Sequence, residues 1–140
     1  MKVLVASVET ELYRGDAESV VTHTSDGEIK IFPGHAPLLA VLRPGLLRIY
    51  CPADKEHPKG RQDMMLISGG FLEVQAKAVT ILVDAFERPE HIDAKKAQQA
   101  VDTARDRLRS APLSEVDKAL VELEIAIARM YLAKRNMGRG

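Results

Sequence analysis

The sequence predicts a two-part protein of mixed β and α class, in which an all-β sandwich or flattened barrel precedes two helices. Before Pro89, short runs rich in Val, Ile and Leu are separated by turn residues, as in an antiparallel sheet. After Pro89 the turn residues become rarer, and the apolar spacing changes from two residues to three and four. We therefore expect a β domain at residues 1–88 and a helical domain at residues 89–140.

The first part contains apolar segments of strand length bounded by turn signals. We predict strands at residues 3–8, 19–24, 28–32, 46–51, 64–68, 71–75 and 79–83. Pro-Gly, Asp-Gly and Gly-Gly pairs lie between several of these segments. Residues 52–63 are rich in charge and contain two prolines, so we predict a long exposed hairpin loop there.

The second part is predicted to form two helices. Asp93 is a suitable N-cap for the first, whose buried face of Ala94, Ala97, Val101, Ala104 and Leu108 is mostly alanine. Residues 110–113 interrupt the pattern. Ser114 and Asp117 then have the spacing of a capping box for the second helix.

The second helix carries two apolar stripes rather than one. The first comprises Val116, Leu120, Leu123, Ile127 and Met130, and the second comprises Val121, Ile125, Ala128 and Leu132. One stripe could meet the first helix and the other the β part. Alternatively, the surplus stripe serves a second conformation or another subunit. Each buried CH₂ contributes about 0.8 kcal/mol, so an alanine-lined seam is weakly held and could open.

Composition excludes several classes of protein. Twenty basic residues balance twenty acidic ones, so no net field favours nucleic acid or an anionic membrane. No apolar stretch approaches the length of a membrane span, and the opening residues do not resemble a secretory signal. Cys51 is the only cysteine, which fits a packed thiol in a reducing, cytoplasmic compartment.

The sequence offers no catalytic constellation. The four histidines show no metal-ligand motif, and Ser68-Gly69-Gly70 matches neither a nucleophile elbow nor a phosphate-binding loop. We therefore predict a noncatalytic protein with no metal and no tightly bound cofactor.

Charge is segregated along the second helix. Acidic residues occupy its first half, whereas Arg129, Lys134, Arg135 and Arg139 occupy its end. This arrangement complements the helix dipole. The same cations could also contact an acidic surface of a partner.

Several motifs in order resemble the epsilon subunits of bacterial F-type ATP synthases. They are DGEIKIFPGHAPLL at 26–39, RPG at 43–45, SGGFLEVQ at 68–75, VTILVD at 79–84, ID at 92–93 and AIARM at 126–130. The resemblance implies a ten-stranded β-sandwich followed by an antiparallel helical hairpin. It also implies a noncatalytic subunit of the central-stalk rotor of a proton-translocating enzyme, peripheral on the cytoplasmic face of the bacterial inner membrane.

The same resemblance implies partners and contact residues. The sandwich would bind the gamma subunit and rest on the c-ring, with Glu28 and His35 facing the ring. The helices would extend among the alpha and beta subunits and inhibit ATP hydrolysis, with Arg129, Lys134, Arg135 and Arg139 as contacts. Lys30 stands where the family commonly has glycine, which adds a cation to the ring-facing surface.

Some family members bind ATP through an element at the start of the first helix. Here that element contains Asp93, with Lys96 in place of the usual arginine. Lysine lacks the bidentate fork of arginine, so we expect weak regulatory ATP binding at best. The alternative is a plain N-cap beside two solvated lysines. The alternative to the rotor function as a whole is a free-standing protein that binds a small ligand or regulates another protein.

Overall fold

The computed structural model describes residues 1–137 and divides into two compact units, Met1–Phe86 and Glu87–Gly140. The sequence-based boundary between residues 88 and 89 lies close to this division. We describe each unit by itself.

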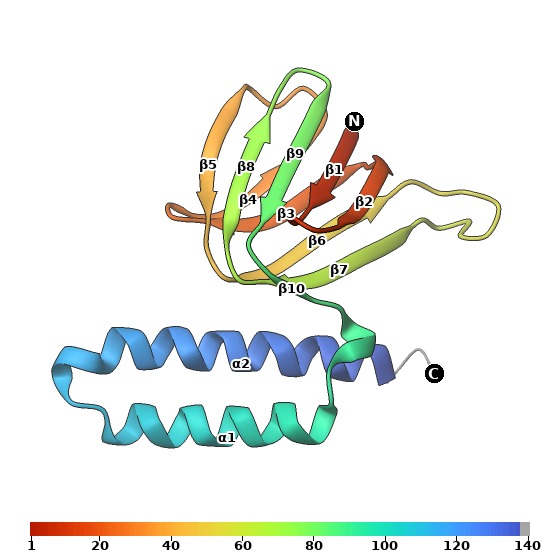
Figure 1. Cartoon of the computed structure of the whole chain (residues 1–140). Coiled ribbons are helices and arrows are strands. Elements are labelled where there is room, and N and C mark those ends of the chain that lie inside the picture. Colours follow the sequence, from red (N-terminus) through yellow and green to blue (C-terminus); the bar gives the residue numbers. More distant parts are fainter. Residues whose placement is uncertain (138–140) are drawn as a thin grey trace. The chain divides into compact units, whose positions relative to one another are not determined.

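The described residues form ten strands (Figure 1). They are β1 (Lys2–Ala6), β2 (Glu11–Asp16), β3 (Ser19–Thr24), β4 (Gly27–Ile31), β5 (Leu38–Leu42), β6 (Gly45–Cys51), β7 (Arg61–Ile67), β8 (Gly70–Val74), β9 (Ala78–Val83) and β10 (Phe86–Glu87).

The strands follow the path β10-β7-β6-β3-β5-β8-β9-β1-β2, with β4 paired to β3 beside the path. A single residue pair, Thr24 with Leu42, joins β3 to β5, so the sheet bends there into two layers. β1 pairs with β9 in parallel and with β2 antiparallel.

The core of the first unit lies between the inner faces of its strands. Alternate side chains along each strand meet there and are fully buried, including Val5, Val20, Ile31, Leu47, Ile49, Met65, Leu72 and Ile81. Every member of this cluster comes from the first unit, so its core is complete without the helices.

The sandwich of ten strands implied by the family resemblance is confirmed, whereas the seven strands counted from the pattern are too few. The pattern missed β2, β5 and β10. The charged segment after β6 does form an exposed loop, but it covers only residues 52–60 because Arg61, Gln62 and Asp63 belong to β7.

The second unit contains η1 (Pro89–His91), α1 (Ala94–Ser110), η2 (Leu113–Glu115) and α2 (Val116–Met137). The two long helices form an antiparallel hairpin (Figure 1). The predicted Asp93 cap is confirmed. The predicted Ser114 capping box is wrong, because Ser114 lies inside η2 and the chain passes from this 3₁₀ turn directly into α2.

The helices meet along a seam rich in alanine. Val101 and Ala104 of α1 cluster with Ala126 of α2, and Leu123 and Met130 pack beside them. Only part of the first apolar stripe of α2 lies at this seam. Two of its other members, Leu120 and Ile127, are 40% and 51% exposed. Small Ala126 lies at the contact because alanine lets the helix backbones approach closely.

Candidate functional site

An exposed apolar row crosses the outer face of β5, β8 and β9. Its members are Val41, Phe71 and Leu82, which are 53%, 56% and 52% exposed. The strand register places Val41 opposite Phe71 and Phe71 opposite Leu82, so the three side chains are lateral neighbours on one face. Leu39, two residues before Val41 on β5, is 72% exposed and extends the row. Contiguous exposed apolar side chains of this kind mark interaction surfaces.

Glu28 and His35 lie on and just after β4. The Glu28 carboxylate is exposed, and its Oε2 lies 3.9 Å from Nε2 of His23 on the paired strand. The half-buried His35 follows a turn in which its backbone N–H donates to the Phe32 carbonyl oxygen at 3.1 Å. Its Nδ1 lies 2.7 Å from the carbonyl oxygen of Ala36. Glu28 is therefore accessible, and His35 is fixed by its own loop.

Lys30 does not extend freely from this surface. Its ammonium group lies 5.1 Å from the ring centroid of Phe32 and 5.5 Å from that of Tyr50. Both distances permit cation–π attraction. The cation that departs from the family pattern is thus positioned over two rings on the surface of the sandwich.

Asp93 and Lys96 open α1, but the structure gives the carboxylate a capping role. Oδ1 of Asp93 accepts hydrogen bonds from the backbone N–H groups of Lys95 and Lys96, at 2.9 and 3.1 Å. The side chain of Lys96 is exposed. The structure therefore supports the N-cap interpretation directly.

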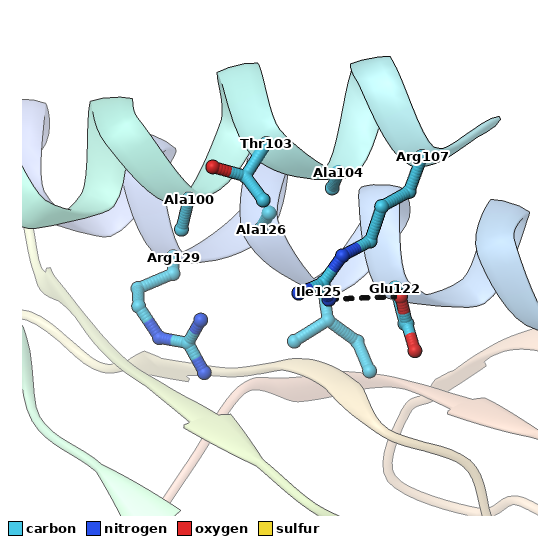
Figure 2. A pocket seen from close by; sticks show the side chains of 8 residues that line it. All are labelled: Ala100, Thr103, Ala104, Arg107, Glu122, Ile125, Ala126 and Arg129. Atoms are coloured by element: carbon cyan, nitrogen blue, oxygen red, sulfur yellow. Dashed lines mark ion pairs between the residues drawn. The ribbon is translucent and has the colours of Figure 1, made fainter. Parts of the chain in front are cut away.

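A cavity of about 410 Å³ lies along one flank of the seam between α1 and α2 (Figure 2). It is lined by Ala100, Thr103, Ala104, Arg107, Glu122, Ile125, Ala126 and Arg129. Figure 2 shows the Arg107 guanidinium directed toward the Glu122 carboxylate, and these groups lie 3.7 Å apart. Both side chains are well exposed, at 68% and 40%, so this pair contributes little to stability.

Arg129 makes a stronger ion pair with Glu87, the first residue of the second unit. Nε of Arg129 donates to both carboxylate oxygens at 3.1 Å, and Nη2 donates to Oε2 at 2.9 Å. The two side chains are 31% and 42% exposed. Charge-assisted, bidentate contacts that are partly withdrawn from water are among the stronger polar interactions in proteins.

The predicted basic end of α2 does not form one face. Successive residues turn by about 100°, so Arg129, Lys134 and Arg135 point in directions roughly 100 to 140° apart. Lys134 is exposed and Arg135 is partly buried. Arg139, the fourth predicted contact, lies outside the described residues.

Cys51 is a packed thiol. It is 6% exposed, and its Sγ lies 3.3 Å from the hydroxyl oxygen of Tyr13. The Tyr13 hydroxyl donates to the Asp16 carbonyl oxygen at 2.7 Å. Burial, followed by the contact with Cys51, raises the pKa of Tyr13.

In the described part of the chain, no group of three or more His, Cys, Asp or Glu is arranged to hold a metal ion. Neither helix there combines the length and the apolar character needed to cross a membrane.

Two of these features escaped the sequence analysis. The sequence did contain a sign of the apolar row. Phe71 and Leu82 alternate with buried residues and share a strand face with the polar residues Glu73 and Thr80, which indicates that this face is exposed. The Glu87–Arg129 pair had none, since the partners are 42 residues apart.

Comparison with known proteins agrees with this architecture. Residues 1–89 match the model of the beta-sandwich domain of the ATP synthase delta/epsilon chain family. The chain is 38% identical over 140 residues to the ATP synthase epsilon chain of Chromobacterium violaceum, covering 96% of each chain.

Two solved structures share the fold. One is a chain of the Euglena gracilis mitochondrial ATP synthase complex of OSCP, F1 and c-ring, with a TM-score of 0.71 and 25% identity, covering 94% of this chain and 79% of that one. The other is a chain of the central stalk and c-ring of Tetrahymena thermophila mitochondrial ATP synthase, with a TM-score of 0.58 and 18% identity, covering 94% and 95%.

Proposed function

The chain belongs to the ATP synthase delta/epsilon family, and from this premise we propose that it couples rotation to ATP synthesis as a noncatalytic subunit of the central stalk. The proposed enzyme translocates protons, and this subunit is peripheral on the cytoplasmic face of the bacterial inner membrane. The match to an epsilon chain over nearly the whole length supports this function over that of a free-standing ligand-binding protein.

The observation that carries the docking role is the apolar row of Val41, Phe71 and Leu82. We assign it to the contact with the gamma subunit. Full burial of one such side chain contributes about 1.5–3 kcal/mol, so three neighbouring ones could supply much of the binding energy of a modest interface. A gamma subunit that covered this row would keep the sandwich attached to the rotor during rotation.

The test is a binding measurement between the full chain and purified gamma subunit. Phe71→Glu should weaken binding at least about 100-fold, because it removes a central apolar contact and buries a charge. Leu113→Glu is the matched control, since Leu113 is 92% exposed but belongs to η2. Equal binding by both variants and the native chain would refute this assignment of the row.

Contact with the c-ring is assigned to Glu28 and His35. The accessible carboxylate on β4 and the fixed imidazole after the next turn offer two polar groups to the loops of the ring. Glu28→Lys should impair coupling between proton flow and ATP synthesis in membranes that carry the assembled enzyme. Glu56→Lys, an exposed charge reversal in the loop after β6, is its control. Normal coupling in the Glu28 variant would contradict the assignment.

The helical hairpin is assigned the inhibition of ATP hydrolysis by extension among the alpha and beta subunits. Its alanine-rich seam buries little apolar surface, which lowers the cost of opening. Arg129, Lys134, Arg135 and Arg139 would then contact acidic surfaces of those subunits. Because the described cations point in several directions around α2, they suit an environment that surrounds the helix rather than a single flat face.

Regulatory ATP binding at Asp93 and Lys96 would be weak. The Asp93 carboxylate already accepts two backbone hydrogen bonds, and lysine offers only a point charge to a phosphate. Calorimetry with the full chain should show no ATP affinity tighter than the millimolar range, about −4 kcal/mol. Micromolar binding that is lost in Lys96→Gln would contradict this expectation.

A further inference from the structure

The buried cluster of the hairpin seam is made largely of small side chains. Its buried cluster consists of Val101, Ala104 and Ala126, and the cavity of about 410 Å³ runs along its flank. A buried alanine methyl contributes less burial energy than a larger apolar side chain would at the same position. Polar contacts of α2 are therefore expected to add substantially to the energy that keeps it in place.

Ion pairs that join α2 to other elements of its own unit include Arg107–Glu122 and Glu87–Arg129. Arg107–Glu122 joins α1 to α2, but at 3.7 Å and with Arg107 68% exposed it is a weak contact. Glu87–Arg129 makes three hydrogen bonds of 2.9–3.1 Å. The second pair is therefore the stronger electrostatic contact of the two.

The position of the Glu87–Arg129 pair suits it to control opening. Glu87 precedes η1, which contacts α2, and Arg129 lies in the second half of α2. α2 cannot leave α1 and η1 as a unit without separating these two charges. Arg129 also lines the cavity on the flank of the seam.

We propose that the Glu87–Arg129 ion pair is an electrostatic latch that holds α2 closed against the rest of the second unit and makes opening sensitive to ionic strength. The latch is a property of the chain itself. Only its consequence for ATP hydrolysis rests on the proposed function.

Hydrogen–deuterium exchange of the full, isolated chain tests the latch. Glu87→Gln and Arg129→Gln should each speed exchange in residues 116–137 by about tenfold or more, as expected when charge-assisted hydrogen bonds are lost. Exchange in β6 and β8 should stay unchanged, which shows that the sandwich remains folded. Arg129→Lys should have an intermediate effect, because lysine keeps the positive charge but cannot donate two parallel hydrogen bonds to the carboxylate.

Asp106→Asn is the matched control. It removes an exposed ion pair with Arg109, at 3.5 Å, that lies within α1 and ties no other element. The double variant Glu87→Arg with Arg129→Glu, in which the two charges are swapped, should restore much of the protection of α2 against hydrogen exchange. Unchanged α2 exchange in both single variants, or no restoration by the double variant, would overturn the proposal.

Salt provides a second readout. Raising the salt concentration from about 0.01 M to 1 M shortens the Debye length from about 30 to 3 Å and should speed α2 exchange in the native chain. The Glu87→Gln variant should respond much less. Equal salt responses would contradict the latch.

Measurement of ATP hydrolysis by the assembled enzyme separates the latch from the proposed function. Glu87→Gln should deepen inhibition, since a less firmly closed hairpin extends more often. Faster α2 exchange with unchanged hydrolysis supports the latch and contradicts the inhibitory role. Unchanged exchange overturns the latch whatever happens to hydrolysis.

Discussion

At the scale of single residues, Gly70 shows how closely β8 and β9 approach. Its φ is +149°, and an added Cβ would overlap the Leu82 carbonyl oxygen and lie 2.9 Å from the Val83 Cα. Both are backbone atoms, which cannot turn aside as a flexible side chain can. Glycine at this position is therefore required by the pairing of the two strands.

We predict that Gly70→Ala destabilises the protein by about 3 kcal/mol or more, from backbone strain together with overpacking. Gly27→Ala separates the two causes, because Gly27 has φ +118° but nothing within 4 Å of the added Cβ. It should cost only about 1–2 kcal/mol. Urea unfolding measures both variants, and equal losses would show that the clash is relieved.

Tyr13 predicts a stability change at alkaline pH. Burial and the neighbouring Cys51 raise its pKa above the unfolded value, so its contribution to stability is fully present below about pH 10 and is lost as pH rises further. Tyr13→Phe should lose less stability than the native chain between pH 9 and 11, about the range in which an unfolded tyrosine ionises. Tyr131→Phe is the control, since Tyr131 is 43% exposed.

The measurement is the urea midpoint at each pH. If the urea midpoints of the native chain and of Tyr13→Phe fall in parallel as pH rises, Tyr13 does not cause the loss of stability at alkaline pH. A profile changed only by Tyr131→Phe would contradict the prediction equally.

Sequence reasoning succeeded at residues whose function is local. The Asp93 cap acts within three residues, and the packing of Cys51 follows from its apolar strand. It failed at Glu87 and Arg129, which meet only after the chain has folded back. The proposed ring-contact residues Glu28 and His35 stay predictions from the resemblance.

At the scale of elements, strands were found where apolar residues dominate and missed where they do not. β2, with sequence ELYRGD, is half polar because it is the last strand on the path and contacts a neighbour on one edge only. β10 has just two residues, below any recognisable period. β5 is apolar, but it is short and lies between Pro37 and Pro44, so the sequence pattern did not distinguish it from the turns on either side.

The hairpin seam predicts a stabilising substitution. Ala100 lines the cavity of about 410 Å³, so Ala100→Leu should fill part of it. We expect a gain of about 1 kcal/mol in the stability of the second unit, because new apolar contacts form without displacing others. Hydrogen exchange of α1 and α2 measures this gain.

Ala97→Leu provides the matched control on the same helix. Ala97 is 2% exposed and is not among the residues that line the cavity, so the larger side chain should cost about 1–3 kcal/mol through overpacking. Stabilisation by both leucines would mean that the whole seam is underpacked rather than its flank alone.

At the scale of the whole molecule, the two units differ in how firmly they are packed. The first has a large core of β-branched and other bulky apolar side chains, all from its own strands. In the second, the seam cluster is smaller and consists of Val101, Ala104 and Ala126, beside which the Glu87–Arg129 ion pair lies. This difference in packing is consistent with the movable inhibitory element proposed above.

Removal of the residues after Ser110 tests this division directly. The truncated chain keeps every residue of the sandwich core and loses α2, so its sandwich should unfold within about 0.5 kcal/mol of the native value. α1 loses its seam partner and should fray, because isolated helices of about this length are marginal in water. Hydrogen exchange of β6, β8 and α1 distinguishes these outcomes within one sample.

In the assembled enzyme the same truncation should raise ATP hydrolysis while the subunit stays bound, because it retains the apolar row proposed for docking on β5, β8 and β9 and removes the helix proposed to inhibit. The control is full-length chain carrying Leu113→Glu, which changes the helix–helix turn without removing α2. Retained assembly with unchanged hydrolysis would show that α2 does not inhibit this enzyme. Loss of assembly would instead place part of the docking surface in the hairpin, contrary to the function proposed for the apolar row.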